Sequence, residues 1–146
     1  MARNRGFTVI ELMMVIVIVG ALAVFGFPRM LSTTAKGEVR GARTKVVALF
    51  NRARGRAIER NRHVTMRITS TLVVVTESVP GGGVDTLHVE DFATAGVGLT
   101  TNVATIQIDP RGVATSLGGT TATIAMSKGS YADSVLISGF GRVLNQ

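Results

Sequence analysis

The sequence contains no cysteine in its 146 residues. Disulfides, thiolate metal sites and cysteine nucleophiles are therefore excluded, and cysteine usage gives no indication of the redox compartment. Other catalytic patterns are missing as well. His63 and His88 stand in no metal-ligand spacing, Ser134 and Ser138 have no base at motif spacing, and Gly81–Gly83 lacks the lysine of a phosphate loop. The sequence predicts no enzyme, no metal site and no cofactor.

Acidic residues are scarce in one part of the chain. Only Glu38 and Glu59 oppose ten basic residues between Lys36 and Arg67, whereas six acids face three basic residues from Ile68 onward. This uneven distribution, within a formal net charge of +7, indicates a polyanionic or acidic partner. The alternative is a solvated helix surface whose long side chains cover apolar groups. The candidate polyanion contacts are Lys45, Arg52, Arg56 and Arg142.

The N-terminal stretch is apolar with one exception. No residue from Leu12 to Phe27 is charged, and residues 7–27 have about the length that a helix needs to cross a bilayer. Arg3 and Arg5 precede this stretch and predict a cytoplasmic N-terminus, with the bulk of the chain outside the membrane. Glu11 lies near its start, although a charge at the centre of a membrane helix costs roughly 2.5–3.5 kcal/mol, and less near the end.

Two ordinary explanations of this stretch leave Glu11 unexplained. A secretory signal peptide would be cut after Ala21-Leu22-Ala23, but the apolar run continues to Phe27. A plain membrane anchor needs no acid at all.

The run Gly6-Phe7-Thr8-Val9-Ile10-Glu11-Leu12 resembles the N-terminal methylation signature of type IV pilins and type II secretion pseudopilins. The resemblance implies that a prepilin peptidase cuts between Gly6 and Phe7 on the cytoplasmic face, and that Phe7 is then N-methylated. Glu11 corresponds to the family's glutamate and would act in assembly together with Phe7. Pro28 lies where many members of the family place a helix-bending proline.

Glu11 then has an expected partner, the amino group of Phe7 on a neighbouring subunit. An ionisable residue inside a membrane segment is a functional candidate whose partner must be found. Pairing relieves the cost of leaving either charge alone in the membrane. The acid is therefore expected to favour assembly.

The remainder of the chain changes from a helical to a strand-like pattern. One apolar face with three- and four-residue steps predicts a helix that ends between Glu59 and Arg62. This face consists of Val39, Ala42, Val46, Leu49, Phe50, Ala53 and Ala57. From Arg62 the period is two, which predicts short strands at 63–69, 71–77, 85–92, 104–110, 112–117, 121–127 and 133–144. Because Val73–Val75 does not alternate, we expect that strand to be buried on both faces.

These elements predict an α+β fold, with the helix packed on a small antiparallel sheet or sandwich. A long helix followed by an all-β part resembles the H-type minor pseudopilins and FimT-like minor pilins, the GspH/FimT family. "IQIDPRGVAT" and "SVLISGFGRV" are similar to late strands of that family. The resemblance implies a pilin-like fold with a leader peptide at 1–6, a transmembrane assembly helix at 7–27, its amphipathic continuation at 28–62 and a periplasmic β-rich domain at 63–146.

The resemblance also implies a function. It indicates a minor pseudopilin of a type II secretion system, in the bacterial inner membrane and the assembled pseudopilus, whose partners are other major and minor pseudopilins or pilins. The alternative is a FimT-like type IV minor pilin that binds nucleic acid during natural transformation. That activity is associated with a Gly-Arg-x-Arg pattern near the C-terminus. Here Gly141-Arg142-Val143-Leu144 lacks the second arginine, which puts DNA uptake in doubt.

Overall fold

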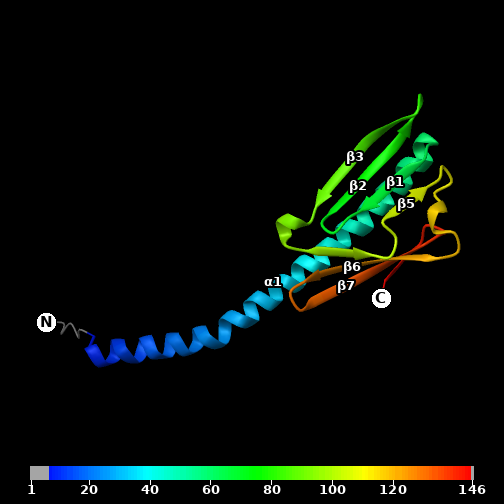
Figure 1. Cartoon of the computed structure of the whole chain (residues 1–146). Helices are drawn as coiled ribbons and strands as arrows, with labels where there is room; N and C mark the ends of the chain where they lie inside the picture. Colours follow the sequence, from blue (N-terminus) through cyan, green and yellow to red (C-terminus); the bar gives the residue numbers. More distant parts are fainter. Residues whose placement is uncertain (1–6, 146) are drawn as a thin grey trace. The chain divides into compact units, whose positions relative to one another are not determined.

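The computed structural model describes residues 7–145, without the side chains of 25–32 and 145. The chain divides into two compact units, Met1–Thr34 and Ala35–Gln146. The first unit, as far as it is described, is helical from Val9 onward. The second unit contains the rest of the same helix and all the strands (Figure 1).

Helix α1, Val9–Arg60, ends where a left-handed residue closes it. Asn61 has a φ of 52°, a conformation that asparagine tolerates better than most residues. The backbone N–H groups of Asn61 and Arg62 donate to the carbonyls of Ile58 and Ala57 at 3.3 and 3.1 Å. This is the Schellman pattern of helix termination, and it confirms the helix end expected from the apolar spacing.

The strands form two four-stranded antiparallel sheets. The first sheet has the order β3-β2-β1-β5 and the second has the order β4-β6-β7-β8. In the first sheet the strands are β1 Val64–Ile68, β2 Leu72–Val79, β3 Gly83–Asp91 and β5 Thr105–Ile108. In the second they are β4 Gly98–Thr101, β6 Thr121–Lys128, β7 Tyr131–Ser138 and β8 Val143–Asn145. Two short 3-10 helices, η1 Ala93–Ala95 and η2 Thr115–Leu117, lie in the connections.

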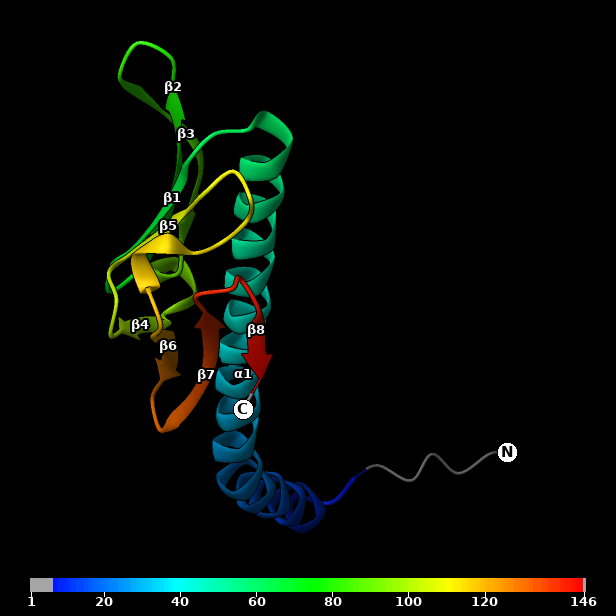
Figure 2. The same ribbon diagram turned by 90° about the vertical axis from the view of Figure 1, so that its right-hand side faces the viewer.

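One hydrophobic core joins the helix to both sheets. Figure 2 shows the strands alongside the part of α1 that belongs to the second unit. All seven residues of the expected apolar helix face are buried, so that prediction is confirmed. They pack with alternate strand residues, since successive side chains of a strand point to opposite faces. The strand residues in this core include Met66, Val73, Val75, Ile106, Ile108, Leu99, Ile124, Met126, Val135 and Ile137.

The α+β order of a helix followed by antiparallel sheets is confirmed, but several strand predictions need correction. Residues 112–117 form a turn and η2 instead of a strand, with only an isolated bridge between Ile108 and Ala114. The run 133–144 is interrupted at 139–142 by the turn between β7 and β8. Strand β4 was not expected, because its four residues, Gly-Leu-Thr-Thr, give almost no alternating pattern.

The prediction that Val73–Val75 is buried on both faces is wrong. Val73 and Val75 are buried, whereas Val74 is only partly buried on the opposite face of the sheet. Three consecutive valines fit the high strand preference of β-branched residues without requiring a cover on both sides.

Phe50 is completely buried in the helix face, so we expect Phe50→Ala to lower the free energy of unfolding by about 3–5 kcal/mol. The loss combines the apolar surface removed with the cavity left behind. Urea denaturation of the full chain in detergent would measure it. Val84→Ala, at a residue 73% exposed on β3, is the control and should change stability by no more than about 0.5 kcal/mol. Equal effects of the two substitutions would contradict the core assigned to Phe50.

Candidate functional site

The first candidate site is the start of α1. The backbone N–H of Glu11 donates to Thr8 Oγ1 at 3.3 Å, and the backbone N–H of Thr8 donates to Glu11 Oε2, also at 3.3 Å. This reciprocal pair is a capping box, which satisfies two of the free N–H groups at a helix start. Thr8 was missed as a site residue, although Thr-x-x-Glu before an apolar run is its sequence signal.

The capping box changes the expected role of Glu11 within one subunit. Its carboxylate has a local partner in Thr8 and lies at the positive end of the helix dipole, which favours an acid there. Both contacts from Thr8, the N–H and the hydroxyl, end on Oε2. The other carboxylate oxygen can therefore take a further donor. Phe7, directly before the cap, is 85% exposed.

Two of the other residues singled out in this region lie outside the described part of the structure, one of them in its side chain alone. Gly6 precedes the described residues, and the side chain of Pro28 is not described. The described apolar side chains around Ile10, Met14 and Val17 are exposed. Within the described part of the chain, no helix has both the length and the apolarity required to cross a membrane.

The second candidate site is the basic part of α1, whose cations lie on two sides of the buried face. On one side, Lys45 Nζ lies 2.5 Å from Glu90 Oε1, on β3. Arg56 Nε lies 3.0 Å from Glu77 Oε2, on β2. Arg52 is exposed on the same side. This side of the helix therefore faces acids of the first sheet.

The opposite side of the helix faces the second sheet. Lys36 Nζ lies 5.7 Å from the centre of the Tyr131 ring, within the range of a cation–π interaction. Arg43 Nη1 lies 3.4 Å from Asp133 Oδ2. Arg54 Nη1 donates to the carbonyl of Gly141 at 3.0 Å. Each set of basic residues on the helix thus contacts one sheet.

Glu77 is the centre of the contacts with the first sheet. It is 2% exposed and accepts from Arg56 and from Arg62, whose Nη1 lies 3.3 Å from Oε1. Burial alone would raise the pKa of Glu77, but the hydrogen bond from Arg56 and the positive charges of Arg56 and Arg62 outweigh it. The pKa therefore lies below its ordinary value of 4.5.

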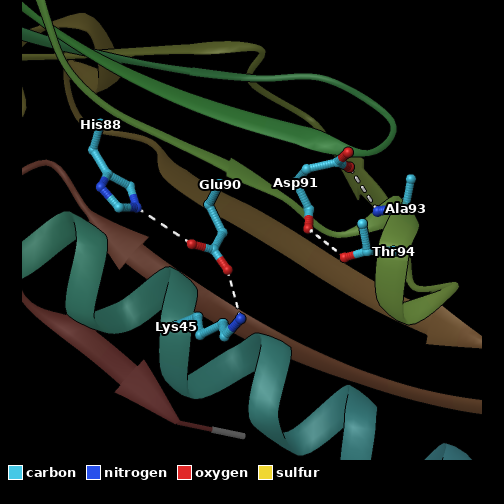
Figure 3. A network of polar contacts seen from close by, with 6 residues as sticks. All are labelled: Lys45, His88, Glu90, Asp91, Ala93 and Thr94. Carbon is cyan, nitrogen blue, oxygen red and sulfur yellow. Dashed lines mark hydrogen bonds and ion pairs between the residues drawn. The ribbon is translucent and has the colours of Figure 1, made fainter.

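A smaller polar network joins β3 to the helix (Figure 3). Glu90 accepts from Lys45 and also lies 3.3 Å from His88 Nε2. The hydrogen bond from Lys45 lowers the pKa of Glu90, against the opposing effect of burial, and His88 lowers it further. Beside this network, the Asp91 carboxylate accepts from the Ala93 N–H at 2.8 Å and fixes the turn after β3. Within the described residues, no group of three His, Cys, Asp or Glu side chains could hold a metal ion.

Arg142 belongs to a different surface from the other candidate polyanion contacts. It follows Gly141 in the turn bound by Arg54, and it is exposed. A Cβ added to Gly141 would lie 2.6 Å from the carbonyl of Gly112, and its φ is 74°, so glycine is required for this close approach. Phe140 projects from the same turn and is 81% exposed. The structure brings Lys45, Arg52 and Arg56 together and places Arg142 with the opposite side of the helix.

Comparison with known families gives two matches on this chain. The profile of the family described as "Type II transport protein GspH" matches residues 42–141. The profile of the "Prokaryotic N-terminal methylation motif" matches residues 1–27.

Two curated relatives are similar over part of the chain. One is the type IV major pilin protein PilA of Myxococcus xanthus (strain DK1622), 38% identical over 61 residues, which cover 42% of this chain and 28% of the relative. The other is the type II secretion system core protein G of Vibrio cholerae serotype O1, 43% identical over 51 residues, or 35% of each chain. The matched part thus spans about a third of each relative's length.

The fold is similar to a solved pilin structure. The type IV minor pilin FimU of Pseudomonas aeruginosa PAO1 superposes with a TM-score of 0.62 at 18% identity, over 78% of this chain and 92% of that one. A second crystal form of FimU gives a TM-score of 0.58. The expected pilin-like fold is therefore confirmed.

The lowered pKa of Glu77 predicts a pH dependence of stability. A carboxyl whose pKa is lower in the folded chain stabilises the fold above its ordinary value of 4.5, and this stabilisation is lost as the pH falls through the lowered pKa. We expect Glu77→Gln to be less stable than the wild type at neutral pH. The difference should shrink as the pH falls below about 4.5.

Urea denaturation across this pH range would measure the effect. Asp85→Asn, which removes an exposed carboxyl on β3, is the control and should follow the wild type. Wild-type and Glu77→Gln profiles that remain parallel at all pH values would contradict the assignment.

Proposed function

The chain belongs to the GspH family of type II transport proteins, and from that membership we propose that it is a minor pseudopilin. In this proposal it is a non-catalytic structural subunit of the periplasmic pseudopilus of a type II secretion system. The observation that carries the proposal is the presence of two signatures on one chain, a pilin methylation motif at the start and a GspH match over most of the remainder. Its partners are other major and minor pseudopilins.

Processing follows from the N-terminal motif. A prepilin peptidase removes residues 1–6 by cutting between Gly6 and Phe7, and the new amino group of Phe7 is methylated. Residues 7–27 then anchor the subunit in the inner membrane with a cytoplasmic N-terminus. Residues 28–62 continue the helix, and residues 63–146 form the β-rich part in the periplasm. The apolar run and the basic residues before it support this topology.

Assembly in this proposal uses Glu11 and Phe7 of two different subunits. A methylated amine keeps its positive charge, so it can donate to the carboxylate oxygen that Thr8 does not occupy. The capping box holds Glu11 in place before the neighbour arrives, and an ordered group loses less conformational entropy on binding. The pair also removes two isolated charges from the lipid.

DNA binding is the second candidate, and one observation favours it. The exposed Phe140 and Arg142 stand on a turn held by two closely packed glycines, Gly139 and Gly141. Arg111 lies on the turn that contacts it and is exposed, although it pairs with the buried Asp109 at 2.8 Å. An aromatic ring beside cations is a surface on which bases can stack. Against this, Lys45 and Arg56 are already paired with acids of the chain. We therefore favour the secretion subunit.

The assembly proposal predicts that Glu11→Ala is inserted and cleaved normally but enters pilin complexes roughly tenfold less well. The lost carboxylate leaves the neighbour's amino group unpaired. Co-purification of partner pilins with the full chain measures incorporation, and N-terminal sequencing that begins at Phe7 verifies processing.

Thr8→Val is the matched control, because it removes the cap and keeps the carboxylate. It should retain most of the incorporation. An equal loss in both variants would assign the effect to helix capping instead of pairing between subunits. Undiminished incorporation of Glu11→Ala would exclude the role proposed for the acid.

Gel-shift titration of the full chain in detergent, with single-stranded and with duplex DNA, separates the two candidate functions. The secretion proposal predicts no shift at low salt. A shift that weakens steeply with salt, and that Arg142→Glu abolishes while the exposed control Arg67→Glu does not, would favour DNA binding. The control lies on β1 and carries the same change of charge.

A further inference from the structure

An open cleft of about 380 Å³ lies between α1 and the first sheet. Its walls are mostly apolar, and three basic side chains lie among them. The lining residues are Leu49, Arg52, Ala53, Arg56, Val75, Leu87 and His88. This volume is at the lower end of the range for ligand pockets and can hold one large side chain.

A β-bulge helps to form this cleft. Val75 pairs with His88 and Thr76 pairs with Thr86, so Leu87 is an extra residue on β3. Neighbouring residues of a regular strand point to opposite faces. At the bulge, Leu87 and His88 both line the same cleft. Bulges re-aim side chains in this way and are over-represented beside functional sites.

The position of β3 leaves the cleft open along one side. β3 is an edge strand of the first sheet, and among the described strands it pairs with β2 alone. A bulge on an edge strand opposes the addition of a further strand, because it interrupts the regular ladder. The geometry therefore favours an inserted side chain over an added strand.

The charges around the cleft favour an acidic partner. Arg52, Arg56 and the nearby Lys45 and Arg62 are opposed by two carboxylates, Glu77 and Glu90. Lys45 pairs with Glu90, while Arg56 and Arg62 share Glu77. Among the described contacts, Arg52 has no acidic partner, and it is exposed at the cleft.

We infer that this cleft is a docking site for a neighbouring pilin subunit, which inserts one apolar side chain and pairs an adjacent carboxylate with Arg52. The inference rests on the proposed function as an assembly subunit. Interfaces depend on a few apolar anchors in pockets, and complementary charge fixes which partner enters. The contact is separate from the one at Glu11, which lies in the other unit of the chain.

The absence of native cysteine allows this inference to be tested by labelling a single introduced thiol. His88→Cys places the thiol in the cleft, at a side chain that is 41% exposed. Val84→Cys, 73% exposed on the same strand and outside the cleft, is the matched control. The full-length variants are labelled with a maleimide in three states: alone in detergent, in membranes without other pilins, and in complexes with partner pilins identified by mass spectrometry.

We expect labelling of His88→Cys to slow at least roughly tenfold in the pilin complexes only, and Val84→Cys to react equally in all three states. Adding Arg52→Glu to His88→Cys should restore most of the labelling, because like charges repel the partner's acid, whereas Arg52→Lys should not.

Three results would overturn the cleft assignment. The first is equal labelling of His88→Cys in all three states. The second is slow labelling of His88→Cys in membranes that lack other pilins, which would indicate that lipid covers the cleft. The third is an equal slowing of labelling at both positions in the pilin complexes. Failure of the proposed function would be distinct, because the wild-type chain would then recover no pilin partner at all.

Discussion

A single helix face has to serve as one wall for two separate sheets, and the rest of the second unit depends on that constraint. The seven apolar residues of α1 supply the shared core. The helix residues that flank this buried face on either side must then pack against strand edges and turns that are partly polar. Long basic side chains meet this requirement, because their aliphatic stems cover apolar surface while their charged ends reach outward. The acids and the aromatic ring that they contact belong to different sheets on the two sides of the helix.

This arrangement gives the uneven charge of the chain an internal explanation. The basic segment and the acidic C-terminal part are distant in the sequence but pair in the fold. Most such pairs are partly exposed, and pairs of that kind contribute little stability individually. Glu77 differs because it is buried, and a buried carboxylate is tolerated only when cations and hydrogen bonds accompany it. Arg56 and Arg62 therefore constrain how the end of the helix meets β2.

Much of the fold could be predicted because its signals are local and periodic. The apolar helix face was identified residue by residue, and most strands were located from alternation. The errors occur where structure depends on distant contacts. Strand β4 is defined by its pairing with β6, and the bulge at Leu87 is defined by the register against β2. Neither feature produces a recognisable residue pattern within its own short segment. For the candidate site, the pilin motif drew attention to Glu11, but Thr8 was missed although its spacing was visible. Glu77 could also have been found, since it continues the inward alternation of Val73 and Val75 and so needed a cationic partner.

The internal pairing also changes what a partner can recognise. Four candidate polyanion contacts were proposed from sequence, but a cation already bound to a buried acid would have to give up that contact before it could bind a phosphate. Arg56 is in this position, since it is bound to the buried Glu77, and Lys45 is paired with the partly exposed Glu90. Of these four, Arg52 and Arg142 have no acidic partner among the described contacts; Arg52 lies beside an apolar cleft, and Arg142 lies beside an exposed phenylalanine. Both surfaces combine basic groups with apolar area, which is typical of protein interfaces. A phosphate backbone instead requires several cations spaced along a strand. The geometry of the paired helix therefore favours a protein partner for this subunit.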